Sequence, residues 1–147
     1  DSDRPLNLGT NVWAFRLGVP MVLPFKLFEK PAFFEFFPSV AFYTDNDDPT
    51  LGADVRAQDP LYMIESHLTY NFTPKLWGGL DLRYRYGGAT TTDGISDENT
   101  QDVLGGGISI GYSFHPAISM QASCGQVLSE KDGSDLDMVR VKLALMF

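Results

Sequence analysis

Apolar residues alternate with polar or small ones along most of this chain, with the period of two that β-strands impose. The clearest stretch is the last, residues 136–147, in which every second residue from Val139 to Phe147 is apolar and the positions between them include Arg140 and Lys142. One face therefore suits hydrocarbon and the other a wet interior, as in an outer-membrane strand. The last strand of a soluble all-β domain is the alternative for this stretch taken alone.

The alternation predicts seven strands, each long enough to cross a bilayer at a tilt. They are expected at residues 13–21, 33–44, 61–72, 76–87, 104–114, 118–125 and 136–147. Short turns (73–75, 115–116) alternate with longer polar loops (45–59, 88–101 and 129–135), and residues 24–32 are expected to be a longer connection on the short-turn side. Outer-membrane barrels have short periplasmic turns and longer outer loops, whereas a soluble meander has no reason to keep this parity. The fold class predicted is therefore an all-β, antiparallel transmembrane barrel.

The amino-acid composition excludes several other classes of protein. The 147 residues suit one domain, and 44% apolar with 13% aromatic residues exclude a disordered chain. No run of 18 apolar residues exists, which excludes a transmembrane helix. A net charge of -8 argues against nucleic acid as a partner, and the single cysteine, Cys124, excludes an internal disulfide. The chain begins at Asp1 without a signal peptide, so we expect it to be mature, processed or truncated.

An odd number of strands does not close a bacterial single-chain barrel, and an open sheet would leave two unpaired edges in hydrocarbon. We therefore expect residues 1–147 to be a single barrel domain that supplies about seven C-terminal strands of a larger barrel. The remaining N-terminal strands of the same barrel would then be a partner of this chain. A barrel shared by several identical chains is the alternative.

Five segments in order resemble a known family: LGTNVWAF at 8–15, NDDP at 46–49, QDPLYMIESHLTYNF at 58–72, LWGGLDLRYRYGG at 76–88 and TTDG at 91–94. They resemble the outer-membrane proteins labelled as components of the meta-pathway of phenol degradation. The resemblance implies a twelve-stranded channel in the outer membrane of Gram-negative bacteria that admits small, hydrophobic molecules, with five strands absent here. The terminal Phe147 resembles the aromatic residue that the barrel-insertion machinery reads. No residue in the sequence selects phenol.

Polar positions on the alternating strands predict which side chains line the channel. They are Arg16, Glu35, Glu65, His67, Asp81, Arg83, Arg85, Gln121, Arg140 and Lys142. A tight turn at 73–75 would place Glu65 opposite Arg83 and His67 opposite Asp81, while a slip of two residues would pair Glu65 with Arg85. Such a lining could set ion selectivity. It could equally be an ion-pair network that stiffens the wall and plugs the lumen.

The sequence thus predicts a passive channel for small hydrophobic or aromatic molecules in the bacterial outer membrane, with lipid and solute as partners. A structural or adhesive barrel with a plugged lumen is the main alternative, and an outer-membrane hydrolase the next. No catalytic residue, cofactor or metal site is predicted: Ser66 and His67 are adjacent in a strand and face opposite sides. The acidic run 45–48 could hold calcium but is better explained as a solvated loop.

Overall fold

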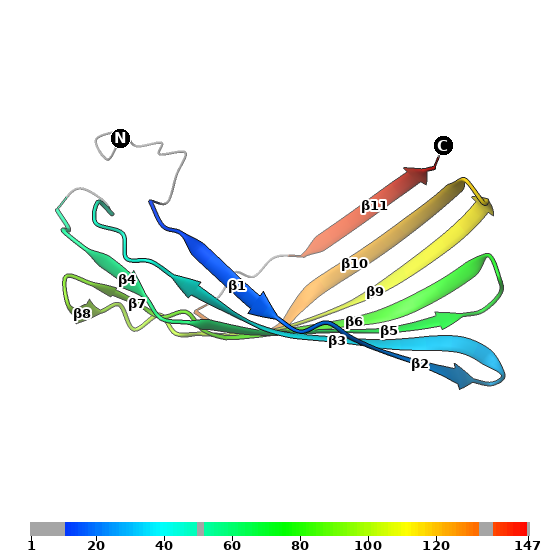
Figure 1. The fold of residues 1–147 in the computed structure, drawn as a ribbon, viewed down its shortest axis with the longest axis horizontal. Coiled ribbons are helices and arrows are strands. Elements are labelled where there is room, and N and C mark those ends of the chain that lie inside the picture. The colour runs from blue at the N-terminus through cyan, green and yellow to red at the C-terminus, as the bar shows by residue number, and fades with distance from the viewer. Residues whose placement is uncertain (1–10, 50–51, 133–136, 147) are drawn as a thin grey trace.

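The computed structural model describes residues 11–49, 52–132 and 137–146, and every regular element in them is a β-strand (Figure 1). The main antiparallel sheet is a curved trough with strand order β1-β3-β5-β6-β9-β10-β11, and β2 also pairs with β3. Its strands are β1 (Ala14–Gly18), β2 (Met21–Leu27), β3 (Lys30–Tyr43), β5 (Leu61–Asn71), β6 (Leu76–Gly87), β9 (Gln101–His115), β10 (Ile118–Lys131) and β11 (Met138–Leu145). Within the described residues, no helix is long and apolar enough to cross a membrane.

β1 and β2 form one interrupted crossing of the wall. Both pair with β3 in a single register, since Gly18 lies opposite Ser39 and Met21 opposite Phe36. Between them the backbone N–H of Val19 donates to the carbonyl of Pro38 at 3.1 Å, whereas Pro20 has no N–H to donate. The main sheet therefore crosses seven times, and the predicted number of strands is confirmed.

The predicted connection at residues 24–32 is wrong, because β2 and β3 form a tight hairpin there. Only Phe28 and Glu29 lie outside the strands, both with positive φ (48° and 62°), as a two-residue hairpin turn requires. In an antiparallel pair only every second residue bonds to the neighbouring strand. Because Val19 bonds to Pro38, Pro24 is one of the residues that do not bond to β3, and its nitrogen points to the open side of β2. Proline on that side of an edge strand breaks no ladder bond.

The two long connections also differ from their predicted form as loops. Residues 45–59 contribute β4 (Arg56–Gln58), and residues 88–101 contribute β7 (Thr90–Thr92) and β8 (Ile95–Ser96). These strands pair as a second sheet in the order β4-β7-β8, beyond the end of the trough opposite the short turns (Figure 1). We call this end the loop end and the opposite one the turn end.

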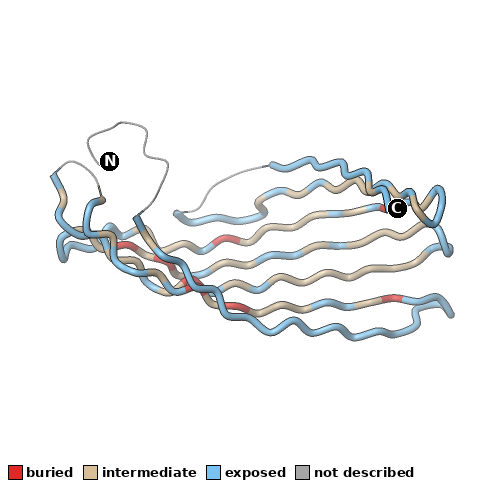
Figure 2. Tube along the Cα trace, turned by 45° about the horizontal axis from the view of Figure 1, so that its top comes forward, coloured by how far each residue is buried: buried red, intermediate tan, exposed pale blue. Residues whose placement is uncertain are grey.

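The main sheet is a single layer, so few side chains are buried (Figure 2). Among the described residues the buried apolar side chains are Ala32, Ala41, Leu61 and Val103. The convex face carries large exposed apolar side chains, among them Leu17 (65% exposed), Leu80 (58%) and Val139 (82%). Aromatic residues gather toward the turn end of this face, where ring centroids lie 5.0 Å apart for Tyr70 and Phe72 and 4.9 Å apart for Tyr112 and Phe114. Such a face is stable only against an apolar medium or partner.

Candidate functional site

The predicted lining residues share the concave face. Register places them on one face, since Arg16 lies opposite Ala41, Glu35 opposite His67, and Gln121 opposite Lys142. The contact between Arg16 and Glu65 across β3 identifies that face as the concave one. The predicted pairings of Glu65 with Arg83 and of His67 with Asp81 are confirmed, so the alternative slip of two residues does not occur. Strands on a curved sheet aim their inner side chains toward one another, which allows contacts beyond the nearest neighbour.

Glu65 is the centre of a charged cluster on this face. Its Oε1 accepts a hydrogen bond from Nη2 of Arg16 at 2.5 Å, and its Oε2 accepts one from Nη2 of Arg83 at 3.3 Å. Arg16 comes from β1, two strands away, and its guanidinium also donates to Oγ of Ser39 and lies 5.0 Å from the ring centroid of Phe37. The Glu65 side chain is only 19% exposed, so one carboxylate balances two guanidinium groups in a partly enclosed position.

A second cluster joins His67, Asp81 and Ser109. Nδ1 of His67 lies 2.5 Å from Oδ1 of Asp81, and the hydroxyl of Ser109 donates to Oδ2 of the same carboxylate at 3.1 Å. The serine is therefore bonded to the acid and not to the imidazole, which is not the order of a hydrolase triad. Ser66 pairs with Phe36 and Leu82 on the opposite face. Within the described residues, no group of three His, Cys, Asp or Glu side chains could hold a metal ion.

The remaining predicted residues lie on the same face outside these clusters. Arg85 lies opposite Met63 and Val103, and Lys142 lies opposite Gln121. Nη2 of Arg140 contacts the sulfur of Met138 at 3.7 Å. Within the described part of the chain, Glu35, Arg85, Arg140 and Lys142 form no ion pair. Phe147, the predicted insertion signal, lies outside the described residues.

The sequence did not single out Ser39, Phe37 or Ser109 as members of these clusters. All three are neutral residues at positions that the alternation predicts to face inward. Their contacts with Arg16 or Asp81 depend on the register between strands, which the sequence does not give.

The continuation of the sixth predicted strand beyond Gly125 was also missed. There β10 continues to Lys131 through a bulge between Val127 and Ser129, and the bulge turns Glu130 to the concave face opposite Val103.

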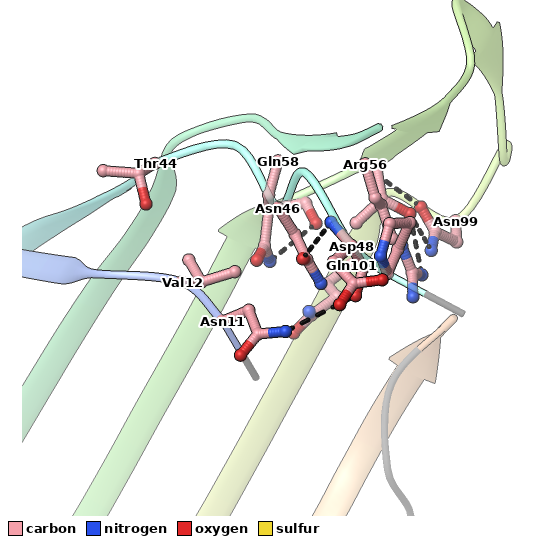
Figure 3. A pocket seen from close by; sticks show the side chains of 12 residues that line it. Asn11, Val12, Thr44, Asn46, Asp48, Arg56, Gln58, Asn99 and Gln101 are labelled. Carbon is pink, nitrogen blue, oxygen red and sulfur yellow. Dashed lines mark hydrogen bonds between the residues drawn. The ribbon is translucent and has the colours of Figure 1, made fainter. Parts of the chain in front are cut away.

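A polar cavity of about 460 Å³ lies at the loop end, between the second sheet and the end of the trough (Figure 3). Seven of its twelve lining residues carry a side-chain amide or hydroxyl group, among them Asn46, Gln58, Thr90, Asn99 and Gln101. Nε2 of Gln58 donates to the carbonyl of Gly88 at 3.2 Å, and the backbone N–H of Thr90 donates to Oδ1 of Asn99 at 2.8 Å. The bond from Gln58 joins the two long connections at this end of the trough, and the bond from Thr90 holds the second connection together.

The second sheet is held by an electrostatic contact at its centre. The carboxylate of Asp97 accepts hydrogen bonds from the hydroxyls of Thr90 and Thr92 and lies 3.7 Å from Nε of Arg56. These bonds, chiefly the one from Thr90, hold the pKa of Asp97 below its ordinary value. Oδ1 of Asp93 accepts the backbone N–H of both Asp54 and Val55, which ties the turn between β7 and β8 to the other connection.

Comparisons with known proteins agree with this architecture. The model of the family described as "Putative MetA-pathway of phenol degradation" matches residues 1–139. The chain also resembles a crystal structure of the COG4313 outer membrane channel from Pseudomonas putida F1, with a TM-score of 0.78 and 24% sequence identity, over 97% of this chain and 52% of that one. The chain thus spans about half the length of that channel. No curated protein matches it. The predicted family and the predicted outer-membrane barrel fold are confirmed.

Proposed function

The chain belongs to the phenol-degradation family whose model matches residues 1–139, and we propose that it forms about half the wall of an outer-membrane channel for passive uptake of small molecules. The barrel lies in the bacterial outer membrane, with its convex face against lipid. Its concave face lines the path of the solute. The observation that carries the proposal is the contrast between these faces: bare apolar side chains on one, and the ion-paired clusters of Glu65 and Asp81 on the other.

Completion of the barrel by further strands follows from the open edges of the sheet. Among the described strands, β11 pairs only with β10, and β1 and β2 pair only with β3. Unpaired backbone groups in hydrocarbon cost several kcal/mol each, on the order expected for any buried polar group without a partner. The resemblance to a channel twice as long supports the view that the missing strands belong to the same barrel.

The solutes we propose are small hydrophobic or aromatic molecules. The support is the family description, which names phenol degradation, together with a concave face that carries Phe33, Phe37 and Trp77 beside its charges. Such a lining can pass a molecule that has an apolar ring and one polar group.

Conductance in a planar bilayer tests the channel. The complete barrel should give stepwise currents, and a lipid-facing variant such as Val141→Leu should give the same unit conductance. A folded barrel that passes no current would overturn the channel and support the plugged structural or adhesive barrel. Ester hydrolysis that is lost in His67→Ala would support a hydrolase instead.

A further inference from the structure

Trp77 lies on the concave face near the turn end, with its indole ring directly over Gly111 of β9. A β-carbon on Gly111 would lie 2.2 Å from Cε2, 2.3 Å from Nε1 and 2.4 Å from Cζ2 of Trp77, so only glycine allows this approach. Gly111 is buried as a result, whereas Trp77 is itself half-buried. The ring therefore covers the wall with one side and presents the other side to the lumen.

The indole N–H is available to a solute. It donates no hydrogen bond to another described residue, and the described residues contain no buried side-chain nitrogen or oxygen without a partner. The N–H must therefore be reachable by solvent. A buried tryptophan that served only to fill space would normally have this donor satisfied by the protein.

Two further donors lie in the same row across the wall. Gly111 pairs with Trp77 on one side and with Gln121 of β10 on the other, and Gln121 pairs with Lys142 of β11. The side chains of Gln121 and Lys142 make no hydrogen bond or ion pair with another described residue. Neighbouring strands are about 5 Å apart, so the amide begins about 5 Å and the ammonium stem about 10 Å from Gly111.

We infer that Trp77, Gln121 and Lys142 form a stacking site for a planar aromatic solute that carries an anionic oxygen, such as an aromatic carboxylate or a phenolate. The solute ring stacks on the free side of the indole, and its oxygens accept from the amide and the ammonium group. The inference rests on the proposed channel, since it places the site on the path of the solute near the turn end.

Quenching of Trp77 fluorescence by 4-nitrobenzoate tests the site, because this planar anion carries a nitro group that quenches indole. The complete barrel is used with Trp13→Phe, and the signal of Trp77 is taken as the difference from the same protein with Trp77→Phe. Quenching should saturate, and benzoate should reverse it, whereas the non-planar cyclohexanecarboxylate should compete less well. Quenching that rises linearly without saturation would overturn the site.

Two glycine variants provide a matched comparison. Gly111→Ala must displace the indole and should raise the dissociation constant about two- to tenfold, the range of an aromatic contact. Gly105→Ala lies on the same strand and face, where a β-carbon meets nothing closer than 3.5 Å, and should leave it unchanged. Equal effects of the two variants would contradict the inference.

Lys142→Gln tests the ammonium group of the site without altering the wall at Gly111. It should weaken binding of the anion about two- to fivefold, as expected for an exposed ion pair, and leave binding of neutral nitrobenzene unchanged. Equal binding of the anion to wild type and Lys142→Gln would overturn the role of the ammonium group. A barrel that conducts ions but shows no saturable quenching would refute the stacking site and not the proposed channel. Saturable quenching in a barrel that passes no current would support the site and refute the channel.

Discussion

Leu143 and Ala144 are neighbours in β11 that face opposite sides of the wall. Leu143 lies opposite Met120 on the convex face and is 62% exposed, whereas Ala144 lies opposite Ser119 on the concave face. Leu143→Arg should cost about 2–4 kcal/mol of unfolding free energy if it lies near the bilayer midplane, because its charge would enter lipid. Ala144→Arg should cost much less, since its charge meets the wet lumen.

Equilibrium urea unfolding in lipid vesicles measures both free energies. Val141→Leu is the control for a change on the convex face that adds no charge. Equal losses for the two arginine variants would show that both sides of β11 contact the same kind of medium, as in a soluble two-sided core.

The β2–β3 hairpin turn contains backbone strain at both of its residues, Phe28 and Glu29, and Glu29 is the one we consider. Glu29 has a φ of 62°, a region in which residues with a side chain are disfavoured and glycine is not. Glu29→Gly should stabilise the barrel by about 0.5–1 kcal/mol. This value is the cost of the left-handed backbone conformation, which glycine avoids, minus the extra conformational entropy that glycine loses on folding.

The same substitution removes the ion pair between Glu29 and Lys26, whose charged atoms are 4.0 Å apart and whose side chains are both exposed. Such a pair contributes little, so Lys26→Gln serves as the control and should change the unfolding free energy by less than about 0.5 kcal/mol. A loss of stability in Glu29→Gly equal to that in Lys26→Gln would show that the pair matters and the backbone does not.

The second sheet should depend on pH through Asp97. Its pKa lies below the ordinary value of 3.8, so its bonds to Thr90 and Thr92 stabilise the sheet at neutral pH and are lost as the pH falls through the lowered value. Hydrogen exchange in residues 88–97 should be faster in Asp97→Asn than in wild type at pH 7, after correction for intrinsic rates.

That difference should vanish in acid well below pH 3.8, where both side chains are neutral. Asp59→Asn changes an exposed carboxylate whose side chain forms no hydrogen bond or ion pair with β7 or β8, and it should leave the exchange of these residues unchanged. A difference that persisted undiminished in acid would mean that the charge of Asp97 does not hold the sheet.

Alternation predicted the crossings, their faces and the register of Glu65 with Arg83, because burial on one side and a tight turn at 73–75 fix those features locally. The β2–β3 hairpin escaped prediction because Pro24 and Pro31 indicate a break. In the structure the nitrogen of Pro24 faces away from β3, and Pro31 lies beyond the last β3–β5 pair, so neither breaks a ladder bond. The second sheet escaped it because β4 and β7 are short strands from two separate connections. The contact of Arg16 with Glu65 required the curvature of the whole sheet.

At the scale of the whole molecule, acidic and basic residues are unevenly distributed between the long connections and the concave face. The chain carries a net charge of -8, and eight of its 19 acidic residues lie in the two long connections, residues 45–59 and 88–101. Of the ten predicted lining residues, five are cationic (Arg16, Arg83, Arg85, Arg140 and Lys142) and three are carboxylates (Glu35, Glu65 and Asp81). Glu130 adds a fourth carboxylate to the same face, so these residues leave a small excess of positive charge on the concave face of this chain.

Glu65→Gln removes the one carboxylate that Arg16 and Arg83 share, so it should leave both guanidinium groups uncompensated on the concave face. The ratio of anion to cation permeability should then rise, as measured by the reversal potential of the complete barrel under a salt gradient. The rise should shrink near 1 M salt, where the screening length falls to about 3 Å. Asp47→Asn removes the same charge from an exposed connection and should change the ratio less. An unchanged ratio in a Glu65→Gln channel that still conducts would show that this cluster lies away from the path of the ions.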